Sequence, residues 1–147
     1  MSKITDFLIG LGTDDKGRAL DEILYWSDAK LEYSHDIIQW LFPLEERSQH
    51  NYDAPFLTVM DVAIIQSTPE IKANILRAYE RFVKFYDNPQ WLTPGNHNYL
   101  RLTRILKCLG IAGLDKEKAI LKKVLNALYI QHGKVIGETT KKYWDAA

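Results

Sequence analysis

The stretch from Glu32 to Leu44 constrains the fold more than any other part of the sequence. At about 100° per residue, its apolar side chains cover most of a helix circumference, and only Glu32, Asp36 and Gln39 form a polar stripe. A surface helix carries one apolar stripe, whereas a helix that is apolar on most sides is buried between its neighbours. Pro43 ends the helix, because proline lacks an amide donor and disfavours the helical conformation in the residue before it. The stretch predicts a central buried helix over about residues 28–42.

The other helices follow from their start signals and from their apolar periodicity. Thr68-Pro69-Glu70 combines a cap, a proline at the first position and an acid in the first turn, which is a strong start signal. Thr58 with Asp61 resembles a capping box. A polar loop is expected from about 45 to 55. The further helices are expected at about 4–11, 20–25, 59–66, 69–86, 97–109, 115–131 and 138–144.

No segment alternates apolar and polar residues over a sustained run, so no β-strand is expected. The chain has 147 residues, of which 46% are hydrophobic and 26% are charged. A chain of this size buries enough surface to fold without a disulfide or a metal. The sequence therefore predicts an all-α fold, a compact multi-helix bundle that forms a single domain over residues 1–147.

The surroundings of the chain can also be anticipated. A single cysteine, Cys108, allows no internal disulfide and is typical of a reducing compartment. No apolar run approaches the roughly 20 residues of a membrane span, and the first residues lack a signal-peptide core. The expected location is the cytoplasm. The oligomeric state is left open.

Charge is distributed unevenly although the net charge is zero. Residues 1–53 hold 5 Lys/Arg against 11 Asp/Glu, a balance of −6, and residues 97–147 hold 10 against 4, a balance of +6. Such asymmetry is typical either of solvated surfaces or of an interaction surface. Nucleic-acid binding through the basic C-terminal third is one alternative function, but the overall neutrality makes it the less favoured one.

Motifs of known catalytic or metal chemistry are missing from the sequence. The four histidines are far apart, with no His-Glu-x-x-His, and no base is placed beside Cys108. We therefore expect no metal, no cofactor and no catalytic residue. The alternative is a small enzyme that uses His35 and His97 as acid–base groups.

Two polar stripes on different helices form the most informative pattern. The first lies on the central helix and consists of Glu32, Asp36 and Gln39. The second lies on the helix after Pro94 and consists of His97, Arg101 and Arg104. Because an unpaired buried charge is costly, Asp36 or Glu32 is expected to pair with Arg101 or Arg104. Two interpretations stay open: an internal ion-pair seam, or a cleft that binds an anionic or peptide ligand. The candidate ligand-binding residues are His35, Asp36, Gln39, Trp40, His97, Asn98, Arg101 and Arg104.

Both stretches resemble the signatures of a known family. Residues 35–44 read His-Asp-Ile-Ile-Gln-Trp-Leu-Phe-Pro-Leu, which resembles the His-Asp-Tyr-Ile-Gln-Trp-Leu-Phe-Pro signature of the opioid growth factor receptor conserved domain. Residues 97–107 resemble its second signature, His-Asn-x-Leu-Arg-Ile-Thr-Arg-Ile-Leu. The likeness spans about residues 14–114, and Ile37 stands where the family usually has tyrosine.

The resemblance implies a binding role and carries no catalytic residues with it. Animal members are described as perinuclear or nuclear receptors for an enkephalin peptide, and they have a longer C-terminal part. What it implies here is a non-catalytic helical module with a possible peptide or protein partner.

Overall fold

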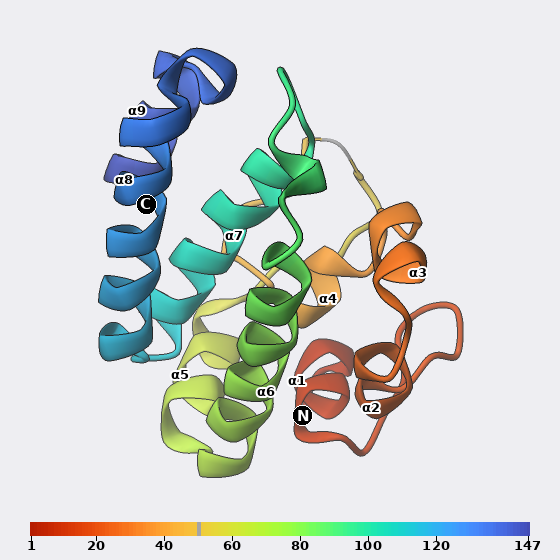
Figure 1. Ribbon diagram of the computed structural model, residues 1–147. Helices are drawn as coiled ribbons and strands as arrows, with labels where there is room; N and C mark the ends of the chain where they lie inside the picture. Colours follow the sequence, from red (N-terminus) through yellow and green to blue (C-terminus); the bar gives the residue numbers. More distant parts are fainter. Residues whose placement is uncertain (50) are drawn as a thin grey trace.

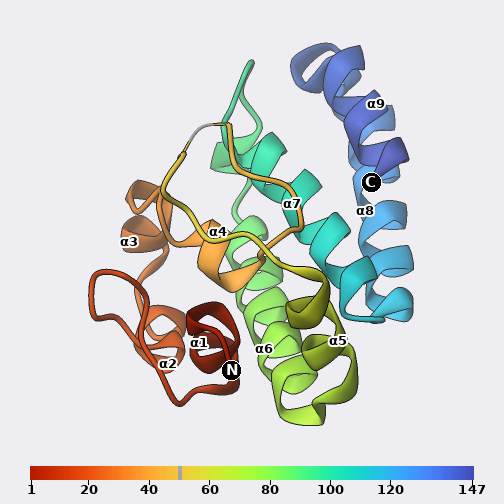
Figure 2. The ribbon, with the colours of Figure 1, turned by 180° about the vertical axis from the view of Figure 1, so that it is seen from behind.

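The computed structural model describes residues 1–49 and 51–147. His50, in the polar loop predicted after Pro43, lies outside the described residues. All regular elements of the described chain are helices, with no β-strand among these residues, and the predicted all-α class is confirmed (Figures 1 and 2). In chain order, the elements are α1 (Lys3–Ile9), α2 (Leu20–Leu24), α3 (Asp28–Tyr33), α4 (Ile38–Leu41), α5 (Val59–Ser67), α6 (Pro69–Tyr86), the 3-10 helix η1 (Pro89–Trp91), α7 (Asn98–Ile111), α8 (Asp115–Ile136) and α9 (Glu138–Ala146).

The predicted helix over 28–42 is wrong as one element, because the segment forms two short helices. The chain leaves the helical conformation at Ser34, with φ −93° and ψ 86°, and becomes helical again only at Ile38. The break lets the two halves point their side chains in different directions. Tyr33 and His35 are exposed, whereas every residue from Ile37 to Leu44 is buried. The start of α3 and the end at Pro43 agree with the prediction, since Ser27 caps α3 and α4 ends at Leu41.

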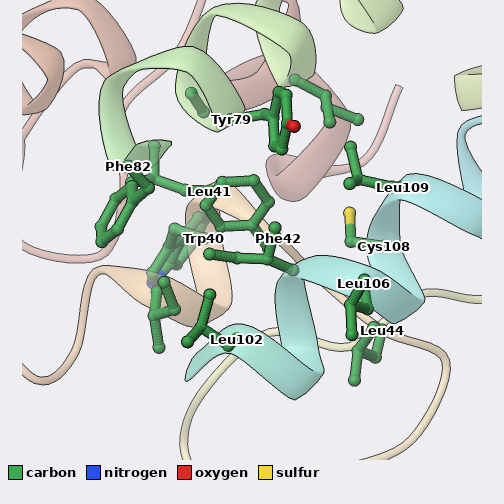
Figure 3. Packing of buried hydrophobic residues seen from close by; sticks show 14 of the residues in the cluster. Trp40, Leu41, Phe42, Leu44, Tyr79, Phe82, Leu102, Leu106, Cys108 and Leu109 are labelled. Carbon is green, nitrogen blue, oxygen red and sulfur yellow. The ribbon is translucent and has the colours of Figure 1, made fainter. Parts of the chain in front are cut away.

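The most buried of the long helices is α7, which crosses the middle of the molecule between α6 and the α8–α9 pair (Figure 1). Most of its residues are buried, and this includes positions that lie on opposite sides of the helix, such as Tyr99 and Arg101. Figure 3 shows the contact that organises the core: Trp40, Leu41 and Phe42 of the α4 segment lie between Phe82 of α6 and Leu102 and Leu106 of α7. The apolar stretch of the α4 segment therefore lies at the centre of the core, but as a short helix packed against the two longer helices α6 and α7.

The C-terminal helices form the outer layer beside α7. Trp144 is buried and donates its indole N–H to the Tyr99 carbonyl at 3.2 Å, which fixes α9 on α7. Helix α8 runs to Ile136 instead of ending before Gly133, with a distortion at His132 (φ −127°, ψ 25°). Gly133 therefore does not end the helix, which continues after the distortion at His132. In the described part of the chain, no helix has both the length and the apolar character needed to cross a membrane.

The capping box at the start of α5 is confirmed and gives a pH prediction. Burial opposes ionisation of Asp61, but the Thr58 amide at 2.9 Å and the Ser2 hydroxyl at 2.7 Å stabilise its carboxylate, so its pKa lies below the ordinary 3.8. Because the pKa of Asp61 is lower in the folded state, its carboxylate contributes to the stability of the fold. This contribution is fully present above about pH 4 and is lost as the pH falls through the folded-state pKa. Between about pH 6 and pH 2.5, the free energy of unfolding of the wild type should therefore fall by about 1 kcal/mol more than that of Asp61→Asn. Urea unfolding at each pH measures both values. Equal pH slopes for the two proteins would contradict the prediction.

Candidate functional site

A pocket of about 350 Å³ lies between α3 and the segment that follows α6. Its acidic residues come from one face of α3, and its aromatic residues come from α3, α6 and η1. Pockets of this volume, with aromatic walls and a few polar groups, are typical of small-ligand and peptide-side-chain sites. The lining residues are Asp28, Ala29, Glu32, Tyr33, Phe85, Asn88, Gln90, Trp91 and Asn96, and they include no lysine, arginine or histidine.

Turn chemistry positions the aromatic wall. The Asn88 side chain accepts a hydrogen bond from the Gln90 amide, which holds the 3-10 turn, and Pro89 supplies the fixed φ at its first position. The Trp91 indole N–H then donates to the Tyr86 carbonyl at 3.1 Å. Trp91 is only 5% exposed, so its ring is a fixed part of the pocket.

Glu32 joins this pocket to the seam predicted from the sequence. One of its carboxylate oxygens lies 2.7 Å from His97 Nε2, and the Asn98 amide donates to both oxygens at 3.1 and 3.3 Å. Asn98 is fully buried, and its side-chain oxygen accepts from the Tyr86 hydroxyl at 3.1 Å. Burial raises the pKa of Tyr86 far above its ordinary value, so its hydroxyl remains a donor. A chain of hydrogen bonds therefore holds the Glu32 carboxylate at the pocket edge.

The two imidazoles of the alternative enzyme prediction lie together at the surface. The ring centroids of His35 and His97 are 5.1 Å apart in an edge-to-face arrangement. Burial lowers the pKa of His97, and the charge of Arg101 and the His35 ring lower it further against the opposing Glu32 carboxylate, so His97 is neutral at pH 7. Neither imidazole lines the pocket between α3 and η1.

The predicted pairing of carboxylates with Arg101 or Arg104 is wrong. Asp36 instead forms ion pairs with Lys16 and with Arg18, whose Nη2 lies 3.1 Å away. Burial raises the pKa of Asp36 and these two cations lower it, and the net shift of the pKa is downward. The loop before α2 thus supplies the cations that pair with Asp36.

The two arginines bind backbone carbonyls instead. Arg101, which is 5% exposed, donates to the carbonyls of Leu31, Glu32 and Ser34 at 3.0, 3.5 and 3.2 Å. Arg104 donates to the Phe42 carbonyl at 3.1 Å. The last carbonyls of a helix have no partner within it, and a cation at this end is also favoured by the helix dipole. These two side chains therefore complete the ends of α3 and α4.

The remaining candidate residues are part of the interior. Trp40 is 5% exposed and packs edge-to-face on Phe7, with centroids 5.4 Å apart. Gln39 is also buried, and its side-chain oxygen has no hydrogen-bond partner among the described residues. Of the eight candidates, only His35, Asp36, His97 and Arg104 reach the surface, fully or in part. The pocket residues that the sequence reasoning missed carried one usable signal, the spacing of Asp28 and Glu32 by four positions on α3.

Metal and thiol chemistry find no support within residues 1–49 and 51–147. There, no group of three or more His, Cys, Asp or Glu side chains is arranged to hold a metal ion. Cys108 is buried, and burial raises its pKa to about 12 despite the nearby Arg104 charge, so its thiol stays protonated.

Comparison with known proteins agrees with the resemblance seen in the sequence. The family model described as the opioid growth factor receptor conserved region matches residues 15–89 and 87–144, which extends the likeness beyond residue 114. No solved structure matches the chain.

Several curated relatives are similar over most of this chain. The rat opioid growth factor receptor is 34% identical over an alignment of 139 residues that covers 79% of this chain and 24% of the rat protein. The human opioid growth factor receptor is 36% identical over 130 residues (71% and 19%), and the mouse opioid growth factor receptor-like protein 1 is 35% identical over 114 residues (65% and 24%). This chain thus spans about a quarter or less of the length of these relatives. With nearly the whole chain matched by its model, the protein belongs to the opioid growth factor receptor conserved region family.

Proposed function

We propose that the protein is a non-catalytic binding module that holds a peptide segment in the pocket between α3 and η1. The observation that carries the proposal is the composition of this pocket, where the Asp28 and Glu32 carboxylates stand beside the rings of Tyr33, Phe85 and Trp91. The relatives are named receptors, which is consistent with a ligand-binding role for the shared region.

The chemistry of the pocket selects a particular kind of peptide. Asp28 is paired with Arg81 at 2.7 Å and Glu32 contacts His97, but no cation is among the residues that line the pocket. The two carboxylates therefore favour a positive group, such as a peptide amino terminus or a lysine side chain. Aromatic rings beside them favour either an apolar side chain or the same cation held over a ring face. The ligand we infer carries a positive charge next to an aromatic or aliphatic side chain.

The residues predicted from the sequence take supporting positions in this proposal. His97 sits at the pocket rim through its contact with Glu32, and His35 stacks against it. Asn98 and Arg101 lie behind them and hold Glu32 and the end of α3. Asp36, Gln39, Trp40 and Arg104 act in the framework that carries α3 and α4.

Selection from a random hexapeptide library tests the proposal. We expect the selected peptides to carry a cation beside an aromatic or aliphatic residue. Tyr33→Ser, at a residue that is 81% exposed, should weaken their binding about fivefold to tenfold, as measured by isothermal titration calorimetry. Glu32→Gln should weaken it by a similar factor, because the charged partner is lost.

The matched control is Tyr25→Ser, which removes a tyrosine that is 86% exposed on another element and outside the pocket. This variant should bind the selected peptides like the wild type. Selection of acidic peptides, or equal affinities of the Tyr33 and Tyr25 variants, would contradict the proposal.

A further inference from the structure

The outer face of α8 combines exposed apolar side chains with lysines. Helix α8 buries Leu121, Leu125 and Ile136 and packs against α7 and α9. On its other side, Ile120, Val124 and Ile130 are 49%, 51% and 85% exposed. Exposed lysines share that side at helical spacing. We call this surface the lysine face; it consists of Lys116, Ile120, Lys123, Val124, Ile130 and Lys134.

Acidic residues in α8 are confined to its first turn, where Asp115 and Glu117 flank Lys116. From Lys118 to Gly137 the sequence has no aspartate or glutamate. Among the described residues, no ion pair involves Lys116, Lys123 or Lys134. By contrast, Lys141 on α9 is paired with Asp145.

The fold separates the acidic and basic parts of the chain. The helices α1 to α3, within the segment with a balance of −6, lie at one side of the molecule, and α8 and α9 lie at the other (Figures 1 and 2). A molecule with this charge separation turns its basic side towards an anionic surface and keeps its acidic side away from it. The ligand pocket at α3 then faces the solvent.

We propose that the lysine face of α8 binds the surface of an anionic lipid bilayer, with Ile120, Val124 and Ile130 entering the headgroup region. Exposed isoleucine and valine beside lysines on one helix are the features of interfacial helices. A nucleic acid would not use the apolar side chains, and the basic third has no arginine after Arg104, although arginine is the preferred residue for phosphate recognition. A second copy of the same face would bring lysines together.

Vesicle flotation with the whole chain tests the proposal. We expect the protein to float with vesicles of phosphatidylcholine and phosphatidylserine at low salt, and to remain in solution with vesicles of phosphatidylcholine alone. Each lysine near the surface contributes about fivefold, so Lys123→Gln with Lys134→Gln should weaken binding about 25-fold. Ile120→Gln with Ile130→Gln should weaken it on the order of tenfold, since the buried apolar area is lost while helix propensity is kept.

The matched control is Leu11→Gln with Lys84→Gln, which changes an exposed apolar residue and an exposed lysine on other parts of the surface. It should float like the wild type, and circular dichroism melts should show that all variants are folded. Absence of flotation with anionic vesicles would overturn the proposal. So would unchanged flotation of the isoleucine variant, or tighter binding to duplex DNA or to a second copy than to the vesicles.

Discussion

Replacing Arg101 with methionine is expected to lower the free energy of unfolding by about 3–5 kcal/mol. The methionine fills the space of the aliphatic part but leaves the carbonyls of Leu31, Glu32 and Ser34 without their donor. Buried acceptors that lose a charged donor are costly, because no water replaces it. Urea unfolding followed by circular dichroism measures the change.

The control for this variant is Arg77→Met on α6. Arg77 forms an exposed ion pair with Asp21 at 2.9 Å, and such pairs contribute about 0–1 kcal/mol. The loss in the free energy of unfolding for Arg101→Lys should lie between those of Arg101→Met and Arg77→Met, since one ammonium cannot reach three carbonyls in the way a guanidinium does. If Arg101→Met and Arg77→Met had equal effects, the role assigned to Arg101 would be wrong.

Phe42→Ala is expected to lower the free energy of unfolding by about 3–5 kcal/mol. Phe42 is completely buried, and its ring meets Phe82 edge-to-face with centroids 5.7 Å apart at the centre of the core in Figure 3. The cavity lies where α4, α6 and α7 meet, so the surrounding helices can close it only by moving together. Chemical denaturation gives the value.

Phe56→Ala provides the comparison for Phe42, because Phe56 is 37% exposed and stacks only on Arg47 among the ring contacts found in the described residues. Its loss should cost about 1 kcal/mol or less. A double-mutant cycle between Phe42 and Phe82 should add a coupling of about 0.5–1.5 kcal/mol. Additive effects of the two substitutions would argue against a direct ring contact.

Helix starts were predictable where a local signal fixes them. The Thr58–Asp61 capping box and the proline at the start of α6 need only neighbouring residues, and both appear in the structure. The core face of α7, with Tyr99 and Leu102, followed from periodicity and is buried. The two family signatures also directed attention to the segments that meet in the core.

The break between α3 and α4 was not predictable from the same reasoning. A segment that is apolar on most sides has only a weak helical periodicity, so a broken path buries its apolar side chains as well as a continuous helix does. Arg101 compensates the break by donating to backbone carbonyls at the end of α3. Every residue has such a carbonyl, so the sequence does not show which ones Arg101 will bind. The predicted pairing of Asp36 or Glu32 with these arginines was wrong for the same reason, because it considered only side-chain acceptors.

The pocket was found only in part for a related reason. Glu32 and His97 stood in the two predicted stripes, and the structure places them 2.7 Å apart. Trp91 joins the pocket through the path of the chain after α6, which depends on how α6 packs and not on any local pattern. The sequence therefore indicated one edge of the site, while tertiary packing supplied the rest.

The hydrogen bonds of Arg101 also bear on how this protein can be divided. They join positions that are 67 to 70 residues apart, with the acceptors in the first family match (15–89) and the donor in the second (87–144). A cut between the two matches would strand the acceptors on one fragment and the guanidinium on the other. We expect a chimaera between two relatives to fold only when the segment with the α3–α4 break and the segment with its arginine fit each other. The two matched stretches therefore form one folding unit.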